Sequence, residues 1–185
     1  MNLAGKFLIA MPGMGDPRFE HSVVVVCAHS SEGAMGLIVN KPAPAPGVAE
    51  VLAELDLPPA QGGRVPQLKV QFGGPVEPGR GFVLHSLDWQ RKATSPLVPG
   101  LALTTSRDIL QDIAAGRGPS RALLLMGYAG WGAGQLEDEI LANGWLTGEA
   151  DAELVLGGAN NRKWEAALAG LGVNPLSLSA TAGRA

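Results

Sequence analysis

The apolar residues of this 185-residue chain fall in short runs that are separated by glycine, proline and polar turn residues. Runs of this kind, when rich in β-branched residues, are typical of strands. The run at 22–29, SVVVVCAH, has no polar alternation and therefore predicts a strand that is buried on both faces. With the turn at 30–33 and the run at 34–40 it predicts a hairpin. Further strands are predicted at 6–11, 68–74, 81–86, 97–106, 121–128 and 152–157.

Apolar residues at helical spacing predict helices between and after these strands. The segment 106–116 is the clearest example, because Thr105 and Asp108 resemble a capping box and Gly116 supplies a stop. The other helices are predicted at 48–57, directly after the glycine-rich stretch at 127–134, and at 162–172.

The order of these elements bears on the fold class. Strands dominate the first part of the chain and alternate with helices only after residue 100. This mixture favours an α+β fold with a mixed, largely antiparallel sheet over a doubly wound fold. No segment is long enough to act as a linker, so a single domain is predicted over 1–185.

The stretch 127–140, GYAGWGAGQLEDEI, predicts a strand that opens through a glycine loop into a helix. It is not a dinucleotide-binding fingerprint, which would need a glycine where Gln135 stands, and the chain has no Walker loop. The carboxylates at 137–139 complement the helix dipole and would repel a phosphate. A packed corner is therefore favoured over a ligand cradle, with Trp131 as the residue most expected to bind something. If the loop glycines have positive φ, alanine in their place would destabilise this corner.

Composition and charge narrow the class of protein. The net charge is −3 and the isoelectric point about 5.6, which disfavours direct binding to nucleic acid. Cys27 is the only cysteine, as suits a reducing compartment. The start of the chain lacks the apolar region of a signal peptide, and no run approaches a membrane span. These features predict a cytoplasmic protein without a membrane partner.

The histidines are the first candidates for chemistry. His29 and His85 stand at the ends of predicted strands and are expected at one rim of the sheet, and Cys27 shares a face with His29 at strand spacing. Zinc would need three or four ligands at a recognisable spacing, which the chain does not offer. Neither a metal nor a cofactor is predicted. A nucleophilic cysteine is unsupported, because this cysteine lies within a buried run.

Asn40 and Lys41 form a second candidate. Asn40 ends a predicted strand, and Lys41 is held extended by Pro42. A lone lysine is usually solvated surface. An anion-binding lysine beside His29 is the alternative.

Four blocks of the sequence resemble the AlgH/YqgE family, in the order that is typical of that family. The resemblance covers nearly the whole chain and implies a small cytosolic bacterial protein whose bent sheet curls into a pseudo-barrel with helices packed outside. Members are often labelled transcriptional regulators, and no accepted catalytic assignment comes with the family. The four family blocks are GKFLIAMPGMGDPRFEHSVVVVCAHSSEGAMGLIVNKP at 5–42, FGGPVEPGRGFVLHS at 72–86, GYAGWGAGQLEDEI at 127–140 and NGWLTGEAD at 143–151.

Three functional hypotheses remain open from the sequence. The favoured one is a binding or regulatory module that acts through a small ligand or a protein partner in one polar pocket. The second is a hydrolase-like enzyme with a histidine base and Glu32 or Glu139 as its orienting partner. The third, direct DNA binding, is disfavoured by the acidic charge and by the lack of a helix-turn-helix pattern. The candidate ligand-binding residues are His29, Asn40, Lys41, His85, Trp131 and Gln135.

Two further points stay undecided at this stage. Whether the protein is an enzyme does not follow from any motif in the chain. The apolar stretch at 96–103, PLVPGLAL, offers a homodimer contact, but the sequence does not decide the oligomeric state.

Overall fold

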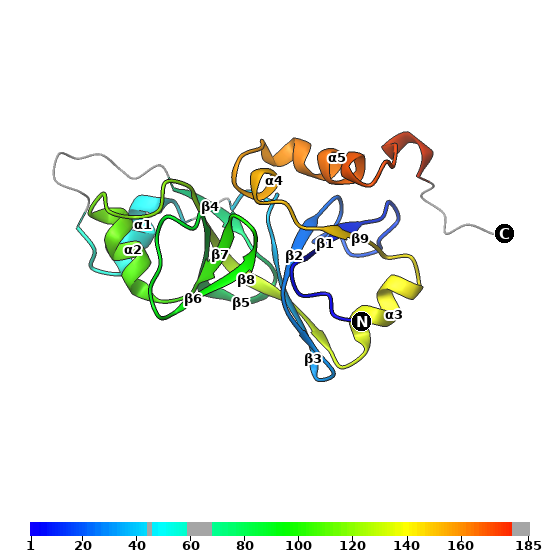
Figure 1. Ribbon diagram of the computed structural model, residues 1–185, viewed down its shortest axis with the longest axis horizontal. Coiled ribbons are helices and arrows are strands. Elements are labelled where there is room, and N and C mark those ends of the chain that lie inside the picture. Colours follow the sequence, from blue (N-terminus) through cyan, green and yellow to red (C-terminus); the bar gives the residue numbers. More distant parts are fainter. Residues whose placement is uncertain (44–45, 59–67, 179–185) are drawn as a thin grey trace.

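The computed structural model describes residues 1–43, 46–58 and 68–178 of the chain, and within them nine strands form one sheet (Figure 1). The strand order is β6-β7-β5-β8-β3-β2-β1-β9, and β4 pairs with β8. All pairs are antiparallel except the parallel pair of β4 and β8. The strands are β1 Lys6–Ala10, β2 Val23–Ser30, β3 Gly33–Ile38, β4 Lys69–Phe72, β5 Val76–His85, β6 Thr94–Val98, β7 Leu101–Thr104, β8 Ala122–Gly132 and β9 Trp145–Glu149.

The helices pack around the outside of this curled sheet. Figure 1 shows α1 and α2 at one end of the molecule, α3 at the other, and α4 and α5 along one side. Helices outside a bent, mainly antiparallel sheet confirm the predicted α+β fold class. The helices are α1 Val48–Glu54, α2 Arg107–Ala114, α3 Gln135–Leu141, α4 Ala152–Leu156 and α5 Asn160–Gly170, followed by a 3₁₀ turn at Pro175–Ser177.

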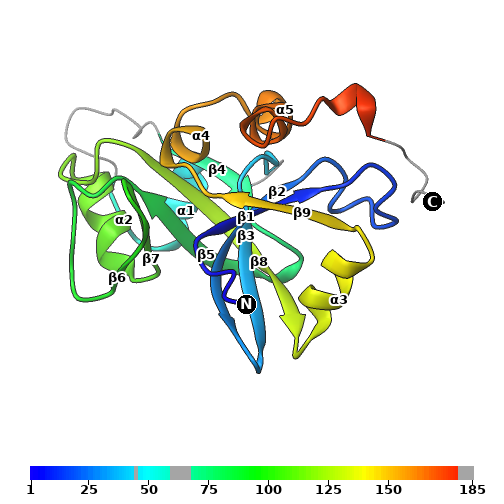
Figure 2. The ribbon, with the colours of Figure 1, turned by 45° about the vertical axis from the view of Figure 1, so that its right-hand side comes forward.

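The strand β8 holds the two halves of the sheet together, and Figure 2 shows it running through both. Its first half pairs with β4 and β5, and its end pairs with β3. Gly127, with φ +74°, lies where the partners change. Here the backbone of Gly73 and Gly74 crosses β8 so closely that a Cβ on either glycine would clash with Gly127 or Tyr128. Glycine is therefore required on both sides of the crossing.

The first half of β2 is buried on both faces, as predicted for the apolar run at 22–29, whereas Ala28 and Ser30 in its second half are exposed. Val23 and Val25 point into a core closed by α4 and α5, whereas Val24 and Val26 point into a core closed by α3. All four side chains are fully buried. A separate apolar cluster lies under α1 and α2, at the other end of the sheet.

The structure corrects several predictions of local structure. The segment predicted as a strand at 152–157 is the helix α4, because the Asp151 side chain accepts the Glu153 backbone N–H and starts a helix there. The strand predicted at 97–106 is the hairpin β6–β7, which turns at Gly100 with φ +83°. The strand β9 was missed, because WLTGE is short and interrupted by a glycine.

Two predictions about helix starts also change. The strand predicted to end at residue 128 continues to Gly132, so Gly130 belongs to β8 and not to a loop. The capping box of Thr105 and Asp108 does not form: α2 begins after Ser106, whose hydroxyl donates to Asp108 instead. None of the helices in residues 1–43, 46–58 and 68–178 has the length and apolarity that a membrane crossing needs.

Candidate ligand pocket

A cavity of about 590 Å³ lies between α3, the start of β9 and the loop that follows β1. Its walls are mostly aromatic and apolar, and two carboxylates open into it. We call it the tryptophan pocket and define it by Met14, Asp16, Phe19, Trp131, Glu139 and Trp145.

Glu139 is the fixed polar group of the tryptophan pocket. Its Oε2 accepts the indole N–H of Trp131 at 2.9 Å and that of Trp145 at 2.8 Å. Its Oε1 accepts the amide of Gln135 at 3.0 Å. The spacing of Gln135 and Glu139 puts both side chains on one face of α3. Since Gln135 also accepts the Gly132 backbone N–H at 3.0 Å, the carboxylate is tied to the end of β8.

The loop after β1 brings the second carboxylate to the pocket. Arg18 forms a two-pronged ion pair with Asp16, with Nη2 2.6 Å from Oδ2 and Nε 3.0 Å from Oδ1. These hydrogen bonds from Arg18 lower the pKa of the Asp16 carboxyl below its ordinary value. Within the described part of the chain, by contrast, no Lys, Arg or His nitrogen lies within 4.0 Å of the Glu139 carboxylate.

A second and larger cavity, of about 800 Å³, adjoins the tryptophan pocket and shares Val76, Gly130 and Trp131 with it. Gly130 does not have positive φ. A Cβ there would meet a Tyr128 ring carbon at 3.4 Å and a Val76 methyl carbon at 3.9 Å, which are contact distances. The backbone therefore does not require glycine at this position. Gly130 lines both cavities without contributing a side chain to either.

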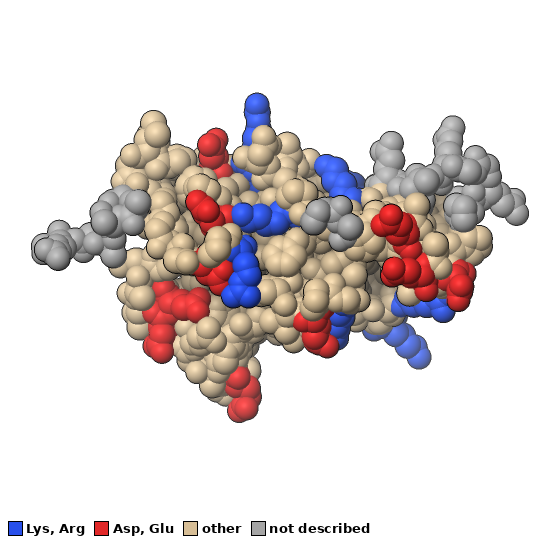
Figure 3. Space-filling view, turned by 180° about the vertical axis from the view of Figure 1, so that it is seen from behind, with Lys and Arg blue, Asp and Glu red and all other residues tan. Residues whose placement is uncertain are grey.

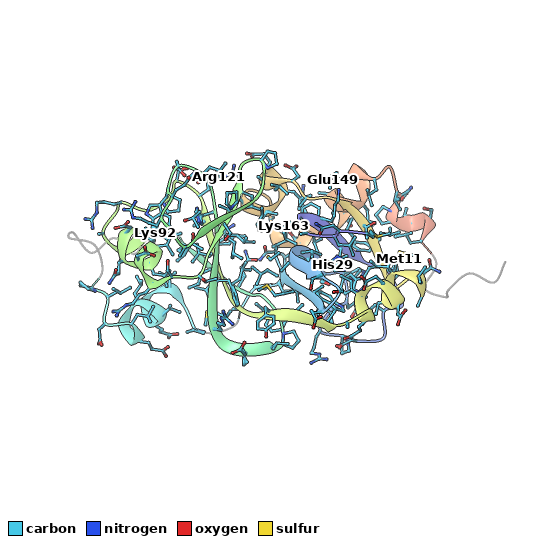
Figure 4. The ribbon with its side chains drawn as sticks, turned by 60° about the horizontal axis from the view of Figure 1, so that its bottom comes forward. Met11, His29, Lys92, Arg121, Glu149 and Lys163 are labelled. Carbon is cyan, nitrogen blue, oxygen red and sulfur yellow. The ribbon has the colours of Figure 1, made fainter. Side chains whose placement is uncertain are left out.

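His29 lies at the edge of the second cavity, and Figure 4 shows it close to α3. The Leu3 backbone N–H donates to Nδ1 at 3.1 Å, so Nε2 carries the proton and donates to Glu137 Oε1 at 2.7 Å. Glu137 therefore takes the place predicted for Glu32 or Glu139. Its own backbone N–H, and after it the bond from His29, lower the pKa of the Glu137 carboxyl. Both ring nitrogens of His29 are thus engaged within the protein.

Cys27 and His29 do not share a face, contrary to the prediction from strand spacing. A β-bulge between Val26 and Ala28 shifts the register of β2, so Cys27 packs into the core under α4 and α5 while His29 meets α3. Burial raises the pKa of the Cys27 thiol to about 12, which keeps it protonated at neutral pH. This cysteine is a structural residue.

His85 is completely buried and lines neither cavity. Nδ1 donates to the Ser86 carbonyl at 2.8 Å, which leaves Nε2 to accept the Thr104 hydroxyl at 2.8 Å. Burial lowers the pKa of His85, against an opposing effect of the Ser86 carbonyl. The neutral ring therefore links β5 to β7.

Asn40 and Lys41 lie in a third place, beside α5. Asn40 accepts the Val23 backbone N–H at 2.9 Å and donates to the His21 carbonyl at 2.8 Å, so its amide fixes the loop before β2. The Lys41 ammonium donates to the Glu20 carbonyl. Both residues line a cavity of about 310 Å³ that lies next to α5 and contains neither His29 nor Trp131.

The prediction of one shared pocket is therefore wrong. Of the six candidate residues, only Trp131 and Gln135 meet in the tryptophan pocket, while His29 lines the adjoining cavity. Sequence reasoning had no site role for Trp145, Phe19 and Met14. Trp131 and the three carboxylates at 137–139 stand within one short stretch, but the pairing of Trp131 with Trp145 depends on how β8 and β9 converge on α3.

All four family blocks meet at the tryptophan pocket, although they are spread over the chain. The first contributes the loop at 13–19 and the second Pro75. The third contributes Trp131 and Glu139, and the fourth Trp145. A curled α+β sheet, a strand crossing that requires glycine and a pocket where the four blocks meet together define the class of small α+β protein to which this chain belongs.

The comparisons with known proteins agree with this class. The chain belongs to the AlgH-like family, whose model matches residues 7–176. It is 55% identical to a UPF0301 protein of Ruegeria pomeroyi over 188 residues, with 100% of both chains covered. It is 53% identical to a UPF0301 protein of Paracoccus denitrificans over 190 residues, covering 100% of this chain and 97% of that protein.

Two solved structures share the fold. The solution structure of the AlgH protein from Pseudomonas aeruginosa has a TM-score of 0.80 and 44% identity, over 100% of this chain and 97% of that one. A crystal structure of a Corynebacterium diphtheriae protein has a TM-score of 0.70 and 22% identity, over 88% of this chain and 83% of that one. The second likeness is one of fold alone.

Proposed function

We propose that this protein is a ligand-binding module and that the tryptophan pocket is its binding site. The observation that carries the proposal is the convergence of all four family blocks on this one cavity. Trp131 and Trp145 also belong to the apolar core closed by α3, and it is the cavity beside them, with its carboxylates, that the proposal assigns to a ligand. The bound molecule would report to a partner through α3 and the loop at 13–19, which form the walls.

The contacts of the histidines favour binding over hydrolysis. A general base needs a ring nitrogen that can reach a substrate. In His29 and in His85 both ring nitrogens already have protein partners. The carboxylate Glu139, which the hydrolase hypothesis used, is held by indole N–H groups and not by a histidine.

The four tryptophans of the chain give a direct test. Each indole N–H gives one resonance in an amide-correlated NMR spectrum. The indoles of Trp131 and Trp145 donate to Glu139 in the pocket, whereas those of Trp89 and Trp164 donate to Asp112 and to the Ala10 carbonyl. A screen of small metabolites and fragments should therefore move the first two resonances and leave the second two in place.

The NMR screen has one outcome that supports the proposal and one that contradicts it. Shifts confined to Trp131 and Trp145, and lost in Trp145→Phe, support the pocket as a binding site. If a broad screen moves only Trp89 or Trp164, or moves none of the four, this proposal fails. The thermal stability of each variant without ligand serves as the control for the fold. In the same measurement, a ligand at ~100 times its dissociation constant should add roughly 2.7 kcal/mol to the free energy of unfolding.

A further inference from the structure

We propose that the ligand of the tryptophan pocket is a small organic cation, with its ammonium group at Glu139 and an apolar body that passes over Gly130. This inference rests on the proposed function, since it names the chemical class that the same site would take. It follows from the carboxylate at Glu139, the charge of the lining, the apolar walls and the glycine at position 130 that lines both cavities.

The first step is the set of hydrogen bonds that Glu139 accepts. Three N–H donors hold its carboxylate, two on Oε2 and one on Oε1. An ionised carboxylate has about four acceptor positions, so Oε1 can still receive a donor. The bonds from Trp131 and Trp145 fix its direction without neutralising its charge. In the described residues no Lys, Arg or His nitrogen lies within 4.0 Å of it, and a bound ammonium would supply such a partner.

The second step is the charge around the pocket. The charged residues of the lining are Asp16, Arg18 and Glu139, so two negative groups and one positive group leave a net charge of −1. Glu137 and Asp138 add negative charge on the same helix. Figure 3 shows acidic side chains where α3 lies, and others at the opposite end of the molecule. This field attracts a cation and repels a carboxylate or phosphate.

The third step is the apolar wall. The rings of Trp131 and Trp145 lie 6.1 Å apart in an edge-to-face arrangement, and Phe19 meets Trp145 in the same way at 5.8 Å. Met14 adds a flexible thioether. Small-molecule sites combine such walls with a few placed polar groups, and aromatic rings favour a cation near them. A hydrated inorganic ion would leave these walls without a partner.

The fourth step is the gap at Gly130. Neither backbone angle nor crowding requires glycine there, unlike at Gly127 or Gly74. Glycine inside a strand often marks a bulge, a tight bend, or a place where a ligand or another backbone comes close, and Gly130 lies in regular pairing with Met35. Since Gly130 lines both cavities, an apolar body that starts at Glu139 can cross it and enter the larger cavity.

Three probes of nearly equal shape test the charge requirement: phenethylammonium, phenethyl alcohol and hydrocinnamate. Each is titrated into the intact protein while the four indole resonances are followed. We expect phenethylammonium to bind at least about tenfold more tightly than the alcohol. Hydrocinnamate should bind most weakly. In Glu139→Gln the difference between ammonium and alcohol should fall to about twofold or less, whereas Asp138→Asn, the same charge change one residue away at an exposed position, should keep it.

A second variant tests the path of the apolar body. Gly130→Val places a branched side chain in the shared wall and should weaken phenethylammonium about tenfold, with Trp89 and Trp164 at their wild-type positions. Equal binding of ammonium and alcohol, tightest binding of hydrocinnamate, or no indole shift with phenethylammonium would each overturn the cation assignment. Unchanged binding to Gly130→Val would overturn the path over Gly130.

The two proposals fail in different ways. If the alcohol moves the Trp131 and Trp145 resonances as readily as the ammonium, the pocket is a binding site without the charge preference inferred here. If neither these probes nor the broad screen moves the two resonances, the proposed function falls as well. Should Glu139→Gln not fold, the comparison of the three probes on the wild-type protein still decides the matter.

Discussion

Lys163 carries an ammonium group into the interior between α5 and the sheet, where Figure 4 shows it (2% exposed). Its Nζ donates to the carbonyls of Val39 and Val155 at 2.9 and 2.8 Å. No carboxylate oxygen of the described residues lies within 4.0 Å of Nζ. Burial, with a smaller effect of Lys69, lowers its pKa to about 8. This residue ties α4 and α5 to the end of β3.

The lowered pKa of Lys163 makes stability depend on pH in a defined interval. Between pH about 8 and its ordinary pKa of 10.5 the unfolded chain keeps the proton that the folded protein releases, so this residue makes the protein more stable as pH rises. Cys27 acts in the opposite direction above pH 9, because its folded pKa is raised. The difference between the wild type and Lys163→Met isolates the lysine.

We expect Lys163→Met to lose about 2 kcal/mol at pH 7, since two buried carbonyls lose their donor. The loss should grow as pH rises from 8 to 10, as measured by urea unfolding at each pH. Lys92→Met, at an exposed lysine, is the control and should change stability little at any pH. A loss that shrinks with pH would contradict the assignment of the lowered pKa to Lys163.

The two glycines at positions 127 and 130 of β8 differ in whether the structure requires glycine there. Gly127 has φ +74°, and a Cβ there would clash with the Gly74 carbonyl. Gly130 has neither restriction. We therefore expect Gly127→Ala to lose at least about 2 kcal/mol, from the left-handed backbone and the clash together. Gly130→Ala should stay within about 0.5 kcal/mol of the wild type. Urea unfolding measures both, and equal losses would show that the crossing does not set the requirement.

At the scale of elements, α3 is a helix that depends on its side-chain contacts. With seven residues it is too short to be stable alone. Leu136 packs into the core, Glu139 receives the two indoles, and Glu137 bonds to His29. Its exposed residue Leu141 adds nothing to this attachment.

Removing one of these contacts should loosen the helix locally. We expect His29→Ala to speed hydrogen exchange of the α3 amides about tenfold or more, because the bond to Glu137 is lost and Leu3 keeps an unpaired N–H. His29→Gln can still donate to Glu137 and should restore much of the protection. Exchange in α5 is the internal reference. If α3 and α5 change together, the bond acts on the whole fold and not on α3.

The pattern of the sequence predicts the elements where burial and propensity agree. The run Val23–Val26 is predicted as a strand by both burial and propensity. The helix α2, Arg107–Ala114, has both the predicted apolar face and the predicted stop at Gly116. The pattern fails where a single side chain or partner decides. Asp151 turns an apolar run into α4, and β9 is a strand because β1 supplies its hydrogen bonds.

The candidate site, too, can be predicted from the sequence only in part. Trp131 and Gln135 could be selected from one stretch of sequence, because a glycine-rich turn into a helix is visible there. Trp145 and the loop at 13–19 reach the pocket only through the pairing of β1 with β9, which no local pattern reveals. His29 and Asn40 were polar residues at strand ends whose hydrogen bonds turned out to be internal.

At the scale of the whole molecule, β8 makes the two ends of the sheet depend on each other. Trp89 lies in the apolar cluster under α1 and α2, and Trp164 lies in the core closed by α4 and α5. We propose that both ends unfold as one unit, because β8 contributes to each. With fluorinated tryptophan, the fluorine signals of both residues should disappear at the same urea concentration. Earlier loss at Trp89 would show two units, and the prediction of one domain would be wrong.

The crossing of Gly73 and Gly74 over β8 also orders the events of folding. The pair Lys69 and Leu123 joins positions 54 residues apart (123 minus 69), whereas β2 with β3 and β6 with β7 join neighbours. Distant pairs close late, because their loop entropy must be overcome first. Pro75 and Val76, which directly follow the crossing, line the tryptophan pocket. A newly made chain would therefore gain its secondary structure before it can hold a ligand, and binding would mark the molecules that have finished folding.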